Sequence, residues 1–212
     1  MVPVLHGYWR SGTSYRIRIA LELKGLAYEQ VCHDLRKDEQ RCKSYLELNP
    51  QGLVPALEVE QGVLTQSPAI LEWIEERWPE PPLLPTEPFA RAEVRAMAAI
   101  VACDIHPLNN MRVLKALKHD LGADNAQITA WAAHWVTSGF DALERAIERH
   151  GHGWAWGETP TFADCCLIPQ VYSARRFEVD LTPYPRILAV DARAAEHAAF
   201  QAAHPDRQPD AD

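Results

Sequence analysis

Hydroxyl side chains gather where the first predicted helix begins. Ser11, Thr13 and Ser14 follow a short apolar run at residues 4–8, and a helical pattern covers residues 14–25. A helix N-terminus carries unpaired N–H groups and partial positive charge, so it stabilises an anion. Lowering a thiol pKa by about two units takes roughly 2.7 kcal/mol of differential stabilisation, which a helix end and hydroxyl donors could supply. The segment fits a thiolate-binding loop, although a plain N-cap at Ser14 explains it equally well when it is taken alone.

Two further segments could hold a small peptide beside that loop. Val54 and Pro55 precede a predicted strand, where a cis-proline would expose the backbone N–H and C=O of Val54 to an extended peptide. Gln66 and Ser67 stand immediately before another predicted helix, which suits a carboxylate. Ser67 could also be a simple N-cap, and the two roles are compatible. With the first loop, these segments predict a site for a thiol tripeptide such as glutathione.

Arginine side chains could supply a second binding function. Arg10 lies beside the hydroxyl loop, Arg112 lies in the first long predicted helix of the second half, and Arg175 and Arg176 lie in a later helix. A guanidinium binds a carboxylate with two parallel hydrogen bonds and keeps its charge at all relevant pH values. Converging arginines would suit a substrate with a carboxylate at each end. The alternative is that Arg112 and Arg175 are ordinary surface or helix-pairing charges.

The composition argues against several other classes of protein. The chain has 212 residues and a net charge of −8, which gives no general electrostatic footprint for nucleic acid or an anionic membrane. No apolar run approaches the roughly 20 residues of a membrane helix, and the N-terminus lacks a signal pattern, so we expect a cytoplasmic protein. His150 and His152 lack the further ligands of a metal site. The five cysteines form no Cys-x-x-Cys pair, and we expect reduced thiols that mostly pack in the interior.

The order of elements predicts an α/β domain followed by an all-helical one. Strands are predicted at 4–8, 28–32, 54–60 and 63–64, and helices at 14–25, 39–48 and 68–78. This βαβαββα order is typical of a thioredoxin-like domain. Beyond a proline-rich stretch, helices are predicted at 89–119, 125–149, 162–177 and 186–203, with a capping box at Thr161 and Asp164 and a loose tail at 205–212. We therefore predict a thioredoxin-like domain at 1–80, a linker at 81–88 and a helical domain at 89–212.

The chain resembles one family over nearly its whole length, the zeta class of glutathione transferases, which includes maleylacetoacetate and maleylpyruvate isomerases. The similar segments are residues 8–29, 49–57, 82–85, 104–114, 180–185 and 208–211. The resemblance implies a glutathione transferase fold, glutathione as cofactor and a homodimer. One difference lies in the first loop, where the family usually has Ser-Ser-Cys and this chain has Ser11, Gly12 and Thr13. The serine that the family uses to stabilise the glutathione thiolate is retained as Ser11.

Site residues follow from the resemblance by position. Those implied for glutathione are Ser11, Thr13, Gln40, Val54, Gln66, Ser67, His106 and Asn110, with Asp104 of one subunit approaching the glutathione amino group of the other. Those implied for catalysis are Ser11, Arg10, Arg112 and Arg176, with Arg176 matching the family better than Arg175.

The activity implied is glutathione-dependent cis–trans isomerisation of maleylacetoacetate to fumarylacetoacetate, a step of aromatic amino acid catabolism. A maleylpyruvate isomerase differs only in the carbon skeleton of its small dicarboxylate substrate. A general conjugating or dehalogenating transferase fits the arginines less well, because they indicate small acids. A non-catalytic interaction protein with the same fold would not need Ser11, Val54 and Ser67.

Overall fold

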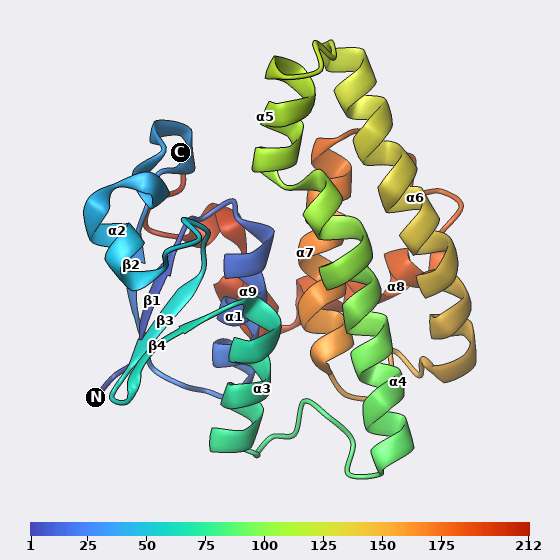
Figure 1. Ribbon diagram of the computed structural model, residues 1–212. Helices are drawn as coiled ribbons and strands as arrows, with labels where there is room; N and C mark the ends of the chain where they lie inside the picture. Colours follow the sequence, from blue (N-terminus) through green and yellow to red (C-terminus); the bar gives the residue numbers. More distant parts are fainter. The chain divides into compact units, whose positions relative to one another are not determined.

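The computed structural model describes residues 1–212, and the chain forms two compact units (Figure 1). The first unit contains Met1–Leu83 together with Ala195–Asp212, and the second contains Leu84–Ala194. The C-terminal segment thus belongs to the first unit, although its sequence continues the helical half of the chain. The domain boundaries given above stay a prediction.

A four-stranded mixed sheet forms the centre of the first unit. Its strands are β1 (Val4–Gly7), β2 (Glu29–Cys32), β3 (Ala56–Val59) and β4 (Gly62–Thr65). They lie in the order β2-β1-β3-β4, with β1 parallel to β2 and antiparallel to β3, and with β3 and β4 joined as a hairpin. With the intervening helices this arrangement confirms the predicted thioredoxin-like βαβαββα order.

Four helices complete the first unit: α1 (Gly12–Leu23), α2 (Lys43–Leu48), α3 (Ser67–Arg77) and α9 (Ala198–Ala203). Helix α1 packs against both α3 and α9, and α2 lies on the opposite side of the sheet (Figure 1). The predicted helix at 39–48 is wrong in its first part, because Cys42 has an extended backbone that separates a short 3-10 turn from α2.

The second unit consists of helices α4 (Pro88–Ala99), α5 (Met111–His119), α6 (Asn125–His150), α7 (Phe162–Arg176) and most of α8 (Pro185–Glu196). The capping box predicted at α7 is confirmed, since the buried Asp164 carboxylate accepts hydrogen bonds from the Thr161 and Ala155 N–H groups, each at 2.8 Å. No helix combines the length and the apolar character needed to cross a bilayer.

Two long predicted helices are interrupted in the structure. The prediction of one helix at 89–119 is wrong, because a π-helical turn at Ile100–Ile105 and a 3-10 turn at His106–Asn109 separate α4 from α5. Pro107 supplies a physical reason, since it lacks the N–H that a continuous helix would need. The predicted helix at 186–203 is also wrong, because His197 has an extended backbone between α8 and α9.

The C-terminal tail is ordered, which corrects the prediction of a loose tail at 205–212. Gln208 is buried, and its side-chain amide donates to the carbonyl groups of Ala202 and His204 at 3.0 and 2.7 Å. The Asp210 carboxylate accepts a hydrogen bond from the Trp9 N–H at 3.0 Å. Polar tail residues therefore find specific partners in the first unit, a result that composition alone does not indicate.

A buried ion pair ties α1 to α3 and to the segment that follows α3. The Lys24 ammonium donates to the Glu75 carboxylate at 2.6 Å and to the Pro81 carbonyl at 2.7 Å, and Glu75 also accepts from the Leu83 N–H at 3.0 Å. The two charged side chains are 0% and 6% exposed. Removing one partner leaves the other charge buried without an opposite charge. This lowers the free energy of unfolding far more than replacing both residues with apolar side chains.

We expect the substitution Lys24→Met to lower the free energy of unfolding by about 3 kcal/mol or more, because the buried Glu75 carboxylate loses its cationic partner. The double variant Lys24→Met with Glu75→Leu should recover part of that loss. Urea denaturation followed by circular dichroism measures both. A loss below about 1 kcal/mol in the single variant would contradict the role of the pair.

Candidate functional site

Three predicted residues form a hydrogen-bonded chain at the start of α1. Ser11 is the N-cap of the helix, and its hydroxyl accepts from the Ser14 N–H at 3.3 Å. The Thr13 hydroxyl donates to the Val54 carbonyl at 2.9 Å, and the Ser11 and Thr13 oxygens are 2.9 Å apart. A carbonyl cannot donate, so the Thr13 proton goes to Val54 and the Ser11 proton goes to Thr13. The structure thus brings Ser11, Thr13 and Val54 together.

This chain also decides which residue caps α1. The simple alternative, in which Ser14 is the cap, is wrong, because Ser14 is fully buried inside the helix and its hydroxyl accepts from the Tyr8 N–H at 3.4 Å. Ser11 therefore stands at the positive end of a helix of 12 residues. The helix dipole would stabilise an anion beside Ser11. The Ser11 hydroxyl could also rotate away from Thr13 and donate a hydrogen bond to that anion.

The Val54 segment is held from behind by two side chains of α2 and the loop after it. The Tyr45 hydroxyl and the Asn49 side-chain amide each donate to the Leu53 carbonyl at 2.7 Å. The Val54–Pro55 peptide bond is cis, as the sequence predicted. These contacts position the Val54 backbone before any ligand arrives.

The third predicted segment lies at the start of α3. Gln66 has a positive φ of 68° and precedes the helix, and its side-chain amide donates to the Gln51 side chain at 2.6 Å. Ser67 is the first residue of α3 and is only 4% exposed. Its hydroxyl accepts a hydrogen bond from Nη1 of Arg16 at 3.2 Å. No role for Arg16 follows from the sequence alone, and the signal that could have found it is its position among the apolar residues of α1, which it shares with Arg18.

Gln40 supplies a buried acceptor that fits a peptide ligand. Its side-chain nitrogen donates to the Asp38 carboxylate at 3.2 Å, whereas its side-chain oxygen is buried without a hydrogen-bond partner. A buried acceptor without a partner costs free energy unless a ligand donor reaches it. With the Ser11 and Ser67 hydroxyls, this donor and acceptor set fits glutathione, which carries a thiol, two amides and two carboxylates.

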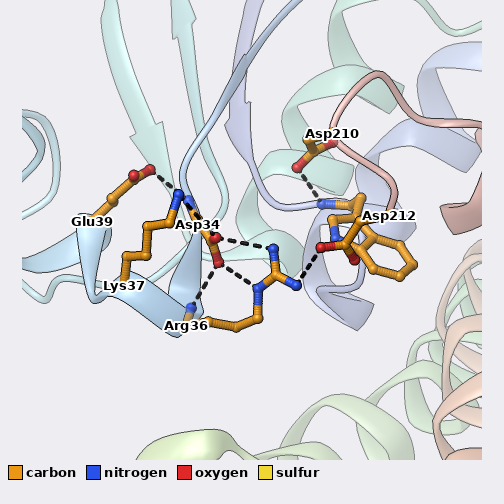
Figure 2. Close-up of polar contacts among 7 residues, drawn as sticks. Asp34, Arg36, Lys37, Glu39, Asp210 and Asp212 are labelled. Carbon is orange, nitrogen blue, oxygen red and sulfur yellow. Dashed lines mark hydrogen bonds and ion pairs between the residues drawn. The ribbon is translucent and has the colours of Figure 1, made fainter.

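Arg10 belongs to a segment that the chain's own C-terminus holds in place. Its guanidinium lies 5.0 Å from the centre of the Trp9 indole, and the Trp9 N–H is bonded to Asp210. Figure 2 shows Arg36 between Asp34 and Asp212, with which it forms ion pairs. The hydrogen bond from Arg36 lowers the pKa of Asp34 to about 2. The tail therefore fixes the backbone next to Arg10, which sequence reasoning did not foresee.

The remaining predicted residues belong to the second unit. Asp104 is exposed in the π-helical turn, and His106 begins the 3-10 turn that follows. Asn110 caps α5, because its side-chain oxygen accepts from the Arg112 N–H at 3.1 Å. The Arg112 and Arg176 side chains are exposed. Their roles in binding substrate or glutathione stay predictions.

Arg175, the neighbour of Arg176, forms an ion pair within the second unit. It contacts the Asp191 carboxylate at 2.5 Å and so pairs α7 with α8. This contact agrees with the simpler alternative weighed for Arg175, a helix-pairing charge.

The cysteines and histidines form no metal site. No group of three or more His, Cys, Asp or Glu residues is placed to hold a metal ion. The five cysteines are free thiols, of which Cys32, Cys42 and Cys103 are exposed and Cys165 and Cys166 are buried. The expectation that they mostly pack in the interior is therefore wrong. Partial desolvation and the hydrogen bond with Asp210 raise the pKa of the Cys32 thiol to about 11, which makes it a poor nucleophile at neutral pH.

Comparison with known proteins places this geometry in a family. Residues 10–77 match the glutathione S-transferase N-terminal domain. A maleylpyruvate isomerase from a Ralstonia species is 54% identical over 208 residues, which cover 97% of this chain and 98% of the relative.

Solved structures agree with the sequence match. The holo structure of a maleylpyruvate isomerase, described as a bacterial zeta-class glutathione S-transferase, has a TM-score of 0.97 and 53% identity, covering 99% of this chain and 100% of that one. A maleylacetoacetate isomerase from Anaeromyxobacter dehalogenans, solved with glutathione in its active site, has a TM-score of 0.91 and 46% identity, covering 100% and 98%. The hydroxyl loop, the Val54 segment and the Ser67 helix end thus lie in a chain that belongs to the zeta class of glutathione transferases, the family of the maleylacetoacetate and maleylpyruvate isomerases.

Proposed function

We propose that this protein is a glutathione-dependent cis–trans isomerase that converts maleylacetoacetate to fumarylacetoacetate. The observation that carries the proposal is the Ser11 hydroxyl at the N-terminus of α1, linked through Thr13 to the Val54 carbonyl. These groups provide a place for a thiolate beside a backbone segment that can hold the cysteinyl residue of a peptide. The relatives with this architecture carry the names of isomerases that act on maleyl substrates.

Bound glutathione would supply a nucleophilic thiolate that adds reversibly to the conjugated double bond of the substrate, allows rotation about that bond and leaves again unchanged. The chain's own groups stabilise the thiolate and orient the peptide. The α1 dipole and the Ser11 hydroxyl favour the anionic form of the thiol. The Val54 backbone and the Ser67 end of α3 fix the peptide, and the Gln40 side-chain oxygen accepts one of its N–H groups.

The same proposal assigns the substrate carboxylates to arginines. Arg10, Arg112 and Arg176 would bind the two acidic ends and disperse the negative charge that develops on the substrate oxygen during addition. His106 and Asn110 would contribute further glutathione contacts. We also infer a cytoplasmic homodimer, in which Asp104 of one subunit meets the glutathione amino group bound by the other.

Maleylpyruvate is the second candidate substrate, and a specific observation favours it. The relative with 54% identity and the structure with a TM-score of 0.97 are both maleylpyruvate isomerases. Both substrates have a cis double bond conjugated with a ketone and a carboxylate at each end, so the chemistry described above serves either one. Absorbance assays of both substrates with glutathione, run side by side, would decide between them through the ratio of kcat/KM values.

We expect Ser11→Ala to reduce kcat/KM at least about 100-fold, because it removes the hydroxyl donor at the α1 N-terminus. The lost N-cap should lower the free energy of unfolding by only about 1 kcal/mol. Isomerisation assays and urea denaturation measure the two effects. The matched control is Ser44→Ala, which removes an exposed hydroxyl in α2 and should leave turnover unchanged. Turnover near that of the wild type in Ser11→Ala would refute the assignment.

A second prediction concerns Thr13, which replaces the usual cysteine of the family. Because the Ser11 proton is directed to Thr13, a thiolate must compete for it. We expect Thr13→Val to end this competition and lower the pKa of the bound thiol by roughly 0.7 unit, equivalent to one hydrogen bond of about 1 kcal/mol. Ultraviolet absorbance of the thiolate during a pH titration of the glutathione complex measures that pKa.

The control for this experiment is Thr13→Ser, which keeps the hydroxyl and should keep the pKa of the wild type. A higher thiol pKa in Thr13→Val would show instead that the Thr13 hydroxyl itself stabilises the thiolate.

A further inference from the structure

Arg16 is a buried charge that contacts one of the proposed ligand-binding groups. It lies in the second turn of α1, is only 2% exposed and places Nη1 3.2 Å from the Ser67 hydroxyl oxygen. A guanidinium has donors and no acceptor, so the Ser67 oxygen accepts this hydrogen bond. The hydroxyl proton of Ser67 then remains available to donate to another group.

The surroundings of Ser67 indicate what that other group would be. Ser67 begins α3, a helix of 11 residues, and the next residue, Pro68, contributes no N–H. The Ser67 N–H lies in the first turn, where backbone donors have no acceptor inside the helix, and the helix dipole is positive there. A hydroxyl that accepts from a cation becomes a stronger donor, because hydrogen bonds in a chain polarise one another. Helix end, hydroxyl and buried guanidinium all favour a carboxylate.

We propose that Arg16 is a positioning residue for the γ-glutamyl α-carboxylate of glutathione, acting through Ser67. The inference rests on the proposed function and adds Arg16 to the residues of the glutathione site. Arg16 holds the Ser67 oxygen so that the hydroxyl proton points to the ligand, and the hydrogen bond from the cation makes that hydroxyl a stronger donor to the carboxylate. The guanidinium makes no contact with the ligand itself.

Arg18 is a natural control in the same helix. It is 1% exposed, and it donates to the Trp9 carbonyl at 2.9 Å and to the Ala203 carbonyl at 3.0 Å. Two residues along a helix correspond to a rotation of about 200°, so Arg16 faces α3 while Arg18 faces α9. Replacing either one removes a buried guanidinium, but only Arg16 contacts Ser67.

The test compares glutathione with 4-aminobutyryl-cysteinylglycine, a peptide that keeps the thiol, the amino group and the glycine but lacks the α-carboxylate. Isothermal titration calorimetry gives Kd for both peptides with the full chain. We expect Arg16→Met to weaken glutathione binding about tenfold and to leave binding of the analogue within about twofold of the wild type. Arg18→Met should change the ratio of the two Kd values by less than about twofold, although it removes an equally buried charge.

Three further variants separate a role in binding from a general loss of stability. Arg16→Lys retains the charge without the planar guanidinium, and we expect it to restore part of the preference for glutathione. If circular dichroism shows that Arg16→Met does not fold, the binding comparison is made with Arg16→Lys instead. Ser67→Ala should lose the same preference, and the double variant Arg16→Met with Ser67→Ala should lose no more than Ser67→Ala alone.

The possible failures are distinguishable. A preference for glutathione that survives in both Arg16 variants, or equal weakening of both peptides, would overturn the role of Arg16 while Ser67→Ala still supports the proposed site. Absence of glutathione binding by the wild type would overturn the proposed function itself and this inference with it.

Discussion

Helix α1 is buried on nearly every side, and the charged side chains within it therefore need hydrogen-bond partners from neighbouring segments. All its residues from Ser14 to Leu21 are buried, and the helix packs against α3 and α9. A charged group in such surroundings loses several kcal/mol of hydration unless hydrogen bonds replace it. Arg16 and Arg18 therefore need partners, which include Ser67 for Arg16 and the backbone carbonyls of Trp9 and Ala203 for Arg18.

The same helix explains how a binding site can exist before a ligand arrives. Its N-terminus presents Ser11, and a hydroxyl chain joins that end to the Val54 backbone. Tyr45 supports the Val54 segment from the other side of the sheet through the Leu53 carbonyl. Groups that are already fixed lose little conformational entropy on binding, so more of the interaction free energy remains for affinity.

The C-terminal tail contributes to this arrangement from the far end of the chain. Asp210 holds the Trp9 N–H, and Asp212 pairs with Arg36 (Figure 2). The tail thus braces the turn between β1 and α1, where Arg10 and Ser11 follow Trp9. A polar sequence can be ordered in this way when its carboxylates meet specific donors, even though it buries little apolar surface.

The sequence by itself determined the order of elements, the family and the main site segments. Alternation and helical periodicity predict the βαβαββα order, and Ser11, Val54 and Ser67 stand at positions where strand and helix ends offer free donors and acceptors. These properties are local, so they can be read along the chain. The interruptions at Pro107 and His197 were missed because an apolar periodicity continues through short breaks in the backbone.

Only the tertiary structure decided which partner each buried polar group would find. The pairs Arg16 with Ser67, Lys24 with Glu75 and Trp9 with Asp210 join residues that are 51, 51 and 201 positions apart. Such pairs depend on how helices and strands pack, and the need of buried charges for a partner does not reveal which residue supplies it. For that reason the segments of the site could be predicted from the sequence, whereas the charge behind Ser67 and the tail beside Trp9 could not.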